Sequence, residues 1–527
     1  MQIYDINVKE NTEEDYEMTT TNICILITII AYLILVVAIG VKFMKESSAN
    51  TDDFYLGGRK LGPFVTAMSA EASDMSSWLL MGLPGVAYAS GLADAAWTAI
   101  GLAVGTYINW LLVAKRLRKY SEVTNSVTVP AFFSHRYRDE KKITGMIAAI
   151  VIIIFFVPYT ASGFSACGKL FSTLFGLNYM TAMIISAIVI VTYTTLGGFL
   201  AASTSDFIQS IVMTIAIVVV LGFGVVNAGG VANVADNASS LAGYFSLTAM
   251  HDATTGEATS YGFLTIVSTM AWGFGYFGMP HILLRFMAIK DSKKLTLSRR
   301  IASVWVVISM AVAILIGIVG NAMTKAGSID ALADSETIVI EISKLIASHG
   351  ILPALVAGVI LAGILAATMS TADSQLLAAS SSASQDILKE VFWKNMTDKA
   401  GMVAARVTVV IIAIVAVFIA RDPNSSVFMI VSFAWAGFGA AFGPAMLFSL
   451  FWKRTNLPGV LAGMISGGAM VFIWKFAVRP LGGAWNIYEL LPAFIVSAVF
   501  IVVVSLLTKA PADEIVKEFD AVGEMQD

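Results

Sequence analysis

The chain has 527 residues, of which 57% are hydrophobic and only 13% carry a charge. A soluble domain carries about 25% charged residues, so lipid is the natural surrounding for this much apolar surface. The net charge of −3 argues against a nucleic-acid partner. The two cysteines and four dispersed histidines show none of the spacings typical of a transition-metal or redox site.

The hydrophobic stretches predict a protein that crosses the membrane many times. The first stretch follows acidic residues, lacks a small-residue cleavage site and is followed by Lys42 and Lys45, which is typical of a spanning helix rather than a signal peptide. A spanning helix needs about 20 mostly apolar residues. By this criterion we expect thirteen spans, at 22–43, 62–90, 94–114, 143–168, 177–197, 206–228, 262–285, 300–323, 350–384, 403–420, 426–452, 457–478 and 488–508.

An odd number of spans puts the two termini on opposite sides, and the basic residues choose the orientation. With the N-terminus outside, the inner segments contain 26 of the 33 Lys and Arg residues, whereas the long outer loop 229–261 contains none. Residues 1–21 are then extracytoplasmic, residues 22–508 form a single transmembrane domain, and residues 509–527 form a short acidic cytoplasmic tail. So short a tail argues against an attached signalling domain.

The second span contains charges, which are costly inside a bilayer and therefore indicate function. It reads Ser69-Ala-Glu-Ala-Ser-Asp-Met-Ser-Ser-Trp78, and Gly82, Pro84 and Gly85 follow. This run predicts a helix that unwinds near 72–76 and leaves backbone carbonyl groups free. Close helix packing through small residues is the simpler alternative for this span taken alone.

The seventh span is interrupted as well. The run Trp272-Gly-Phe-Gly-Tyr-Phe-Gly-Met-Pro-His281 brings three glycines and a proline together, which predicts a second break. The two broken spans lie five apart, so they cross the membrane in opposite directions. Paired discontinuous helices in oppositely oriented halves indicate the binding site of a secondary transporter.

The ninth span contributes hydroxyl groups. Ser370 and Ser374 share one face of the expected helix, and Thr371 lies beside Ser370. Hydroxyl and carbonyl oxygens suit a hard monovalent cation, whereas zinc or copper would require His or Cys ligands. The alternative is that these hydroxyl groups bond back to their own helix or join neighbouring helices.

These motifs resemble the sodium/solute symporter family, and most closely its bacterial sodium/proline symporters. The matching strings keep the family's order and are spread over most of the chain: Asp53-Phe-Tyr-Leu-Gly-Gly-Arg59, Ala72-Ser-Asp-Met-Ser76, Trp78-Leu-Leu-Met-Gly-Leu-Pro-Gly85, Gly197-Gly-Phe199, Trp272 to His281, and Met369-Ser-Thr371. The resemblance implies an all-α membrane protein with a LeuT-like core. That core consists of two inverted five-helix repeats, about 62–228 and 262–452, with extra helices at both ends.

The resemblance also implies the residues of the site. Sodium would be bound by carbonyl oxygens of Ala72, Met75 and Ala367 and by hydroxyl groups of Ser370 and Thr371. Ion coupling would depend on Asp74, Asp206, Asp373 and Ser374. The substrate would contact Ser76, Tyr159, Trp272, Tyr276, Met279 and Pro280. Three residues depart from the family's usual choice and bear on selectivity, namely Glu71, Ser77 and Met279.

The function implied by the resemblance is sodium-coupled secondary active symport, without catalysis, in the bacterial inner membrane. The solute is a small amino acid, L-proline first, imported by alternating access. Proton coupling, or transport of another small neutral amino acid or a betaine-like solute, is the alternative. A transporter-like nutrient sensor is more remote. So is an intramembrane hydrolase with Asp74 and Asp373 as its catalytic pair, because no membrane-protease motif surrounds them.

Overall fold

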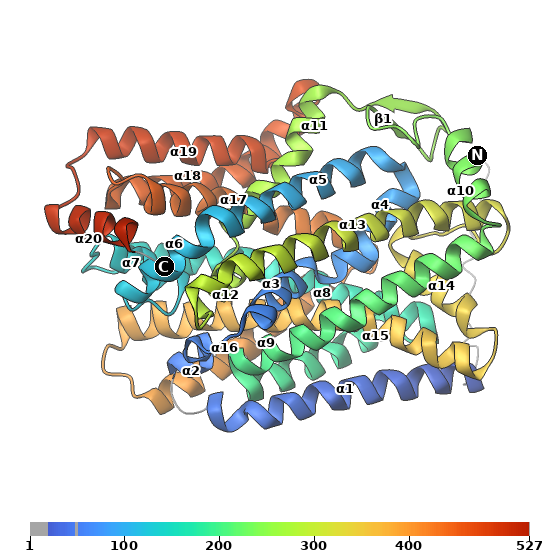
Figure 1. Ribbon diagram of the computed structural model, residues 1–527, viewed down its shortest axis with the longest axis horizontal. Coiled ribbons are helices and arrows are strands. Elements are labelled where there is room, and N and C mark those ends of the chain that lie inside the picture. Colours follow the sequence, from blue (N-terminus) through green and yellow to red (C-terminus); the bar gives the residue numbers. More distant parts are fainter. Residues whose placement is uncertain (1–18, 48–50, 526–527) are drawn as a thin grey trace, which may run out of the picture.

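The structure, a computed structural model, describes residues 19–47 and 51–525 and consists almost entirely of helices. Most of them run along one common direction (Figure 1). The long helices are α1 (Thr20–Ser47), α5 (Leu92–Ile108), α8 (Ile143–Phe175), α9 (Tyr179–Asn227), α13 (Leu295–Lys325), α15 (Ile351–Ser381), α16 (Asp398–Ile419), α17 (Val427–Phe451), α18 (Leu457–Ile473) and α19 (Leu490–Leu507).

Shorter elements complete the fold. The short helices are α2 (Thr51–Leu56), α3 (Pro63–Ser77), α4 (Leu83–Ser90), α6 (Ala114–Val123), α7 (Val129–Arg136), α10 (Val231–Ser240), α11 (Phe263–Met270), α12 (Pro280–Ala288), α14 (Ile338–Ala347) and α20 (Asp513–Glu524). Strands β1 (Ala249–His251) and β2 (Ala258–Ser260) pair antiparallel. The π-helical and 3₁₀ segments that the argument uses are η2 (Trp78–Gly82), η4 (Ala271–Phe277) and η7 (Ser382–Phe392).

The predicted spans coincide with helices. Within the described residues, ten helical segments are long and apolar enough to cross a membrane. Two shorter apolar segments, Tyr179–Thr195 and Phe263–Phe277, and the interrupted stretch 63–90 correspond to the other predicted spans. The multi-span helical architecture is therefore confirmed, whereas the count of thirteen stays a prediction. Most of the predicted segment 1–21 lies outside the described residues.

Helix α15 forms the centre of the molecule. It packs against α1, α3, α8 and α9, and every residue from Ile360 to Ser381 is buried. Neighbouring α9 is kinked at Gly198, where a positive φ of 61° separates two helical arms. Glycine adopts this backbone conformation without a steric penalty. The hydroxyl-rich face of α15 is thus enclosed by protein rather than by lipid.

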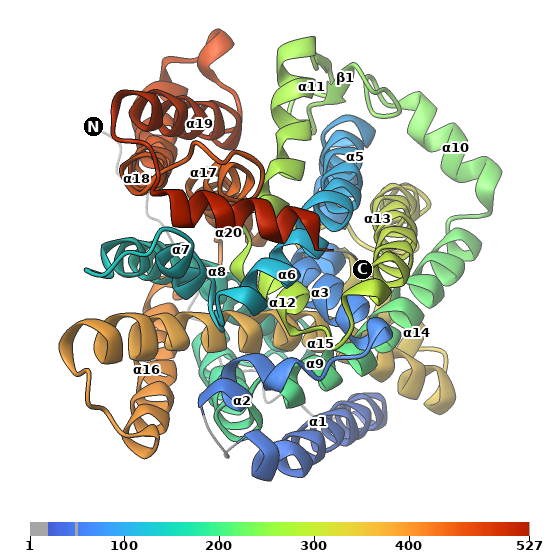
Figure 2. The same cartoon turned by 60° about the vertical axis from the view of Figure 1, so that its left-hand side comes forward.

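Short elements gather at both ends of the bundle. Helices α2, α6, α7, α12 and α20 lie at the left-hand end in Figure 1, and α10 and the β1–β2 hairpin lie at the opposite end. The sequence analysis did not predict a helix in the tail. Residues Ile515, Phe519 and Val522 recur at helical spacing and bury one face of α20, and Figure 2 shows this helix lying across α6. An ion pair joins Glu514 to Arg138, which follows α7.

Candidate ion and substrate site

The first predicted break lies in α3 at Ser76. This residue has φ 48° and ψ −171° in an otherwise helical run, and its Oγ accepts a hydrogen bond from the N–H of Trp78 at 3.1 Å. A positive φ is costly for a residue other than glycine and often marks a functional site. The break is narrower than the predicted unwinding over 72–76, because Ala72 and Met75 keep helical dihedral angles.

The second predicted break separates α11 from α12. The 3₁₀ segment η4 follows α11, and α12 begins only at Pro280, after the extended residue Met279. A side chain at Gly275 would lie 1.9 Å from Nε1 of Trp435, so glycine is required for this close approach. The same Nε1 donates to the carbonyl of Trp272 at 2.7 Å. Trp435 therefore satisfies a backbone group that the irregular helix leaves free.

Four of the five predicted sodium ligands lie together where α3 meets α15. Ser370 Oγ donates to the carbonyl of Ala72 at 2.8 Å and lies 3.1 Å from the carbonyl of Ala367. Thr371 Oγ1 donates to the same Ala367 carbonyl at 3.1 Å. These two hydroxyl and two carbonyl oxygens form a cluster without a charged group. In the structure the carbonyl oxygens accept hydrogen bonds from the hydroxyl groups. A bound cation would take the place of those hydroxyl protons.

Met75, the fifth predicted ligand, lies one residue before the break. Its carbonyl accepts the N–H of Trp78. The adjacent Asp74 points toward the predicted substrate pocket: its Oδ2 accepts a hydrogen bond from the hydroxyl of Tyr276 at 2.5 Å, and its carbonyl accepts one from Tyr159 at 3.1 Å. Asp74 therefore joins both broken helices and α8.

A second polar cluster surrounds Arg285 of α12. Its Nη2 donates to Oδ2 of Asp206 at 3.1 Å and to Oγ of Ser374 at 2.6 Å, and its Nε donates to Ser69 at 3.0 Å. Ser374 also lies 2.9 Å from the carbonyl of Ser370. The predicted coupling residues Asp206 and Ser374 are therefore brought together next to the oxygen cluster.

The remaining coupling residue, Asp373, has partners of its own. Its Oδ2 accepts a hydrogen bond from the hydroxyl of Tyr193 at 2.7 Å, and Oδ1 lies 3.1 Å from Oγ of Ser374. Asp74 is held instead by Tyr276. The two carboxylates thus belong to different hydrogen-bond networks, an arrangement unlike a catalytic pair.

Sequence analysis missed the role of Arg285. It grouped this residue with the charges that orient the inner end of a span, but only 1% of the side chain is exposed. The available signal was its place in the seventh span, since an ionisable residue within a span usually faces the protein interior and has a partner. Its partner Asp206 is also fully buried.

The predicted substrate residues surround a very small cavity. A cavity of about 10 Å³ is lined by Asp74, Met75, Trp78, Leu102, Tyr159, Trp272, Val431 and Trp435. This is about the space that one water molecule needs, so an amino acid can enter only if the side chains move. Tyr276 reaches this region through Asp74. Ser76, Met279 and Pro280 are not among the lining residues.

Aromatic rings cover this cavity toward the end of the molecule that carries the β hairpin. Trp272 stacks on Tyr488 with ring centroids 5.2 Å apart and contacts Phe428 at 5.5 Å. Nearby, Glu336 accepts hydrogen bonds from the backbone N–H groups of Val427 and Phe428, each at 3.0 Å, and so caps the first turn of α17. A buried ion pair at 2.8 Å ties Glu336 to Lys169 of α8.

The three departures from the family's usual residues are all buried. Glu71 accepts a hydrogen bond from Nε1 of Trp110 at 2.9 Å, and Ser77 and Met279 are fully enclosed. Met279 caps the N-terminus of α12 with its backbone, because its carbonyl accepts the N–H of Leu283 at 3.1 Å. The Met279 side chain takes no part in this cap.

The broken helices and the oxygen cluster define a class of protein, the cation-coupled secondary transporters. Two solved structures share the fold. A Na⁺-coupled sialic acid symporter in a substrate-bound outward-open state matches with a TM-score of 0.75 at 16% identity, over 93% of this chain and 99% of that chain. A nucleobase-cation-symport-1 family transporter in a closed conformation with bromovinylhydantoin bound matches with a TM-score of 0.53 at 14% identity, over 89% and 98%. The predicted LeuT-like fold is confirmed.

The chain belongs to the sodium:solute symporter family, whose model matches residues 54–467. An osmoregulated proline transporter of Bacillus subtilis is 40% identical over 489 residues, which cover 93% of this chain and 96% of the relative. A sodium/proline symporter of Staphylococcus saprophyticus is 40% identical over 509 residues, covering 95% and 96%. The family consists of transporters, so the prediction that the chain is not an enzyme is confirmed.

Proposed function

We propose that this protein is a sodium-coupled symporter that imports a small amino acid, with L-proline as the first candidate. The proposal is supported by family membership and by the names of relatives that are 40% identical over more than nine tenths of the chain. The observation that carries it is the meeting of Ser370 on α15 with the carbonyl of Ala72, one turn before the break at Ser76. An uncharged cluster of hydroxyl and carbonyl oxygens suits sodium.

In this proposal, sodium binds among the oxygens of Ala72, Ala367, Ser370 and Thr371, and Met75 contributes a carbonyl once α3 unwinds further. The ion then fixes the position of the broken helix and completes the adjoining substrate pocket. Binding of both partners closes the outer side, and one group of helices rocks to open the inner side. The membrane potential adds about 2.3 kcal/mol per transported charge per 100 mV.

Substrate recognition in this proposal uses aromatic faces and backbone amides. Tyr159 and Trp272 line the small cavity, and such faces can hold an apolar ring and attract a cationic amine. The N-terminus of α12, at Pro280, offers backbone N–H groups of the kind that bind carboxylates. No arginine or lysine lines this cavity within the described residues, which favours a monocarboxylate.

The orientation and domain boundaries belong to the same proposal. We assign the N-terminus to the outside and the end of the molecule with α6, α7 and α20 to the cytoplasm of a bacterial cell. This end carries many of the basic residues, including Arg116, Arg138 and Lys453, as expected for an inner face. Residues 22–508 form one transporter domain, with inverted repeats at about 62–228 and 262–452.

Uptake into proteoliposomes tests the coupling ion and the solute together. An inward sodium gradient should drive accumulation of radiolabelled L-proline, whereas a proton gradient without sodium should not. Unlabelled small neutral amino acids and betaine should compete more weakly than unlabelled proline. Accumulation driven equally well by a proton gradient would contradict sodium coupling. Stronger competition by aspartate or a neutral sugar would refute the solute assignment while leaving sodium symport intact.

Replacing Met279 by glutamine should shift selectivity toward more polar analogues. The side chain is fully buried at the start of α12, so an amide there gains its hydrogen bonds only from a polar ligand or a rearranged neighbour. Calorimetric titration in saturating sodium should give a higher ratio of hydroxyproline affinity to proline affinity than in the parent. A matched Met323→Gln substitution, buried in α13, should leave this ratio unchanged. An unchanged ratio in Met279→Gln would remove this residue from the pocket.

A further inference from the structure

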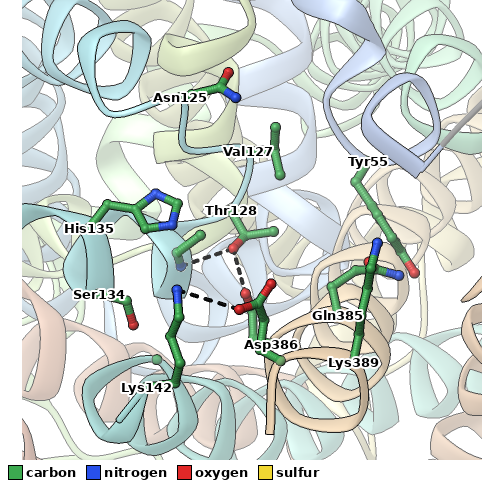
Figure 3. A pocket seen from close by; sticks show the side chains of 13 residues that line it. Tyr55, Asn125, Val127, Thr128, Ser134, His135, Lys142, Gln385, Asp386 and Lys389 are labelled. Carbon is green, nitrogen blue, oxygen red and sulfur yellow. Dashed lines mark hydrogen bonds and ion pairs between the residues drawn. The ribbon is translucent and has the colours of Figure 1, made fainter. Parts of the chain in front are cut away.

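A polar cavity lies at the same end of the molecule as α7 and α20, away from the proposed substrate site. Its volume is about 210 Å³, compared with the about 10–15 Å³ that one water molecule needs by the same measure. Helix α7, the start of α8 and the π-helical segment η7 form its walls (Figure 3). The cavity is large enough for a small amino acid, whereas the cavity beside Asp74 is not.

Two buried polar atoms on the cavity wall lack hydrogen-bond partners. Asp386 is 6% exposed, and its Oδ1 accepts a hydrogen bond from Thr128 at 2.9 Å while its Oδ2 has no partner. The neighbouring Gln385 has an unpartnered Nε2. Buried polar atoms are normally satisfied, and exceptions call for an explanation. A carboxyl oxygen and an amide donor therefore line one cavity.

The backbone that carries these two residues is unusual. Ser382–Phe392 continues α15 as a π-helix, a rare geometry that recurs at functional sites. Thr128 fixes Asp386 from the opposite wall, because it also caps α7 by accepting the N–H of Ala131 at 3.0 Å. Asp386 is thus held in place by a residue that is itself anchored.

Acidic and basic side chains both line the cavity. Lys142 pairs with Glu390 at 3.4 Å, and Lys389 lines the same cavity (Figure 3). Burial lowers the pKa of His135 below its usual value, so this ring is neutral at pH 7. Two acidic and two basic side chains thus line the cavity, so partners for both groups of a zwitterion lie within it.

The cavity also adjoins the coupling cluster. A smaller cavity of about 10 Å³ shares Tyr55, Val127 and Thr128 with it and extends to Arg285 and Ser374. The hydroxyl of Tyr55, which lines both cavities, lies 2.8 Å from the hydroxyl of Ser384. The larger cavity therefore stands between the proposed ion-coupling residues and the end of the molecule assigned to the cytoplasm.

We propose that this cavity is a second binding site for a small zwitterionic amino acid, distinct from the site beside Asp74. Asp386 Oδ2 accepts the hydrogen bonds of the ammonium group, and Gln385 Nε2 donates to the carboxylate. This proposal rests on the proposed function for the identity of the amino acid, which is the transported solute on its way to the cytoplasm. The site binds the amino acid without sodium, because none of the α15 residues proposed to bind sodium lines it.

Equilibrium dialysis of the purified full-length protein against radiolabelled L-proline tests the proposal. In saturating sodium the parent should bind two equivalents, one of which persists when potassium replaces sodium. Asp386→Asn keeps an acceptor for Thr128 but removes the charge, and Gln385→Leu removes the donor. Each variant should lose the sodium-independent equivalent and retain the sodium-dependent one. The double variant Ser370→Ala/Thr371→Ala should lose the sodium-dependent equivalent and retain the sodium-independent one. Glu341→Gln on α14, part of an exposed pair with Lys344, is the control and should bind two equivalents.

The outcomes separate this proposal from the proposed function. A parent that binds a single, sodium-dependent equivalent overturns the second site while the symporter assignment stands. Two equivalents in both Asp386→Asn and Gln385→Leu, with unchanged affinity, overturn it as well. If only Asp386→Asn loses the sodium-independent equivalent, Gln385 does not bind the carboxylate. The proposed arrangement of the zwitterion is then wrong. If all proline binding by the parent is independent of sodium, the proposed function is refuted instead. Size-exclusion chromatography of each variant checks that folding is intact.

Discussion

Replacing Ser370 and Thr371 together by alanine should raise the sodium concentration for half-maximal proline uptake at least tenfold. The pair supplies both hydroxyl groups of the proposed ion site. A contact to a charged partner contributes about 1.5–3 kcal/mol, and about 1.4 kcal/mol corresponds to a factor of ten in affinity. Alanine has the highest helix propensity, so α15 should persist. Initial rates over a series of external sodium concentrations measure the shift.

Thr368→Ala is the matched control for this double substitution. Thr368 lies on the same buried helix, and its hydroxyl donates to the carbonyl of Ile364 in the preceding turn, at 2.9 Å. Its removal should leave the sodium concentration for half-maximal uptake within about twofold of the parent value. The reason is that this hydroxyl bonds within its own helix and does not contact the proposed ion. Parent-like sodium activation in the double variant would place the ion elsewhere, and an equal shift in Thr368→Ala would indicate a general effect on helix packing.

The two helix breaks could be predicted because their causes are local. Glycine destabilises the interior of a helix, and proline removes one of its hydrogen bonds, so the run 272–281 indicated the interruption that η4 and the start of α12 form. The polar run 69–78 indicated a break as well, but not its width. Only Ser76 departs from helical dihedral angles in α3, and the π-helical segment η2 begins two residues later, at Trp78.

The pairing of residues across helices could be predicted only in part. The hydroxyl face of 370–374 was visible as helical spacing, but its contact with Ala72 depends on how α3 and α15 pack. Resemblance to a family supplied that pairing. The tail helix α20 was missed for the opposite reason: its apolar residues Ile515, Phe519 and Val522 have the right spacing, but so short a stretch is stable only when docked on another surface.

Arg285 was missed because a charge near the end of a span usually faces the water. In the structure it instead connects four helices: it lies on α12, donates to Ser69 of α3 and Ser374 of α15, and pairs with Asp206 of α9. A buried ion pair is costly when one partner is removed. The half-helix that follows the second break is therefore fixed to the helix that carries the sodium-type oxygens.

Asp74→Asn should reduce sodium-driven proline uptake by roughly tenfold to a hundredfold, because losing one charged hydrogen-bond partner costs about 1.5–3 kcal/mol. The asparagine side chain can still accept the hydrogen bond from Tyr276, so the loss reflects the missing charge rather than a missing contact.

Asp53→Asn is the control. Asp53 pairs with Lys60 at 3.5 Å, and the Asp53 and Lys60 side chains are 19% and 57% exposed. An ion pair with one partner in water contributes little, so uptake should fall less than about twofold. A buried carboxylate within a span is retained only at a cost, which is why the two substitutions should differ. Initial uptake rates, normalised to the amount of reconstituted protein, decide the matter, and equal effects of the two substitutions would contradict the assignment of Asp74 to coupling.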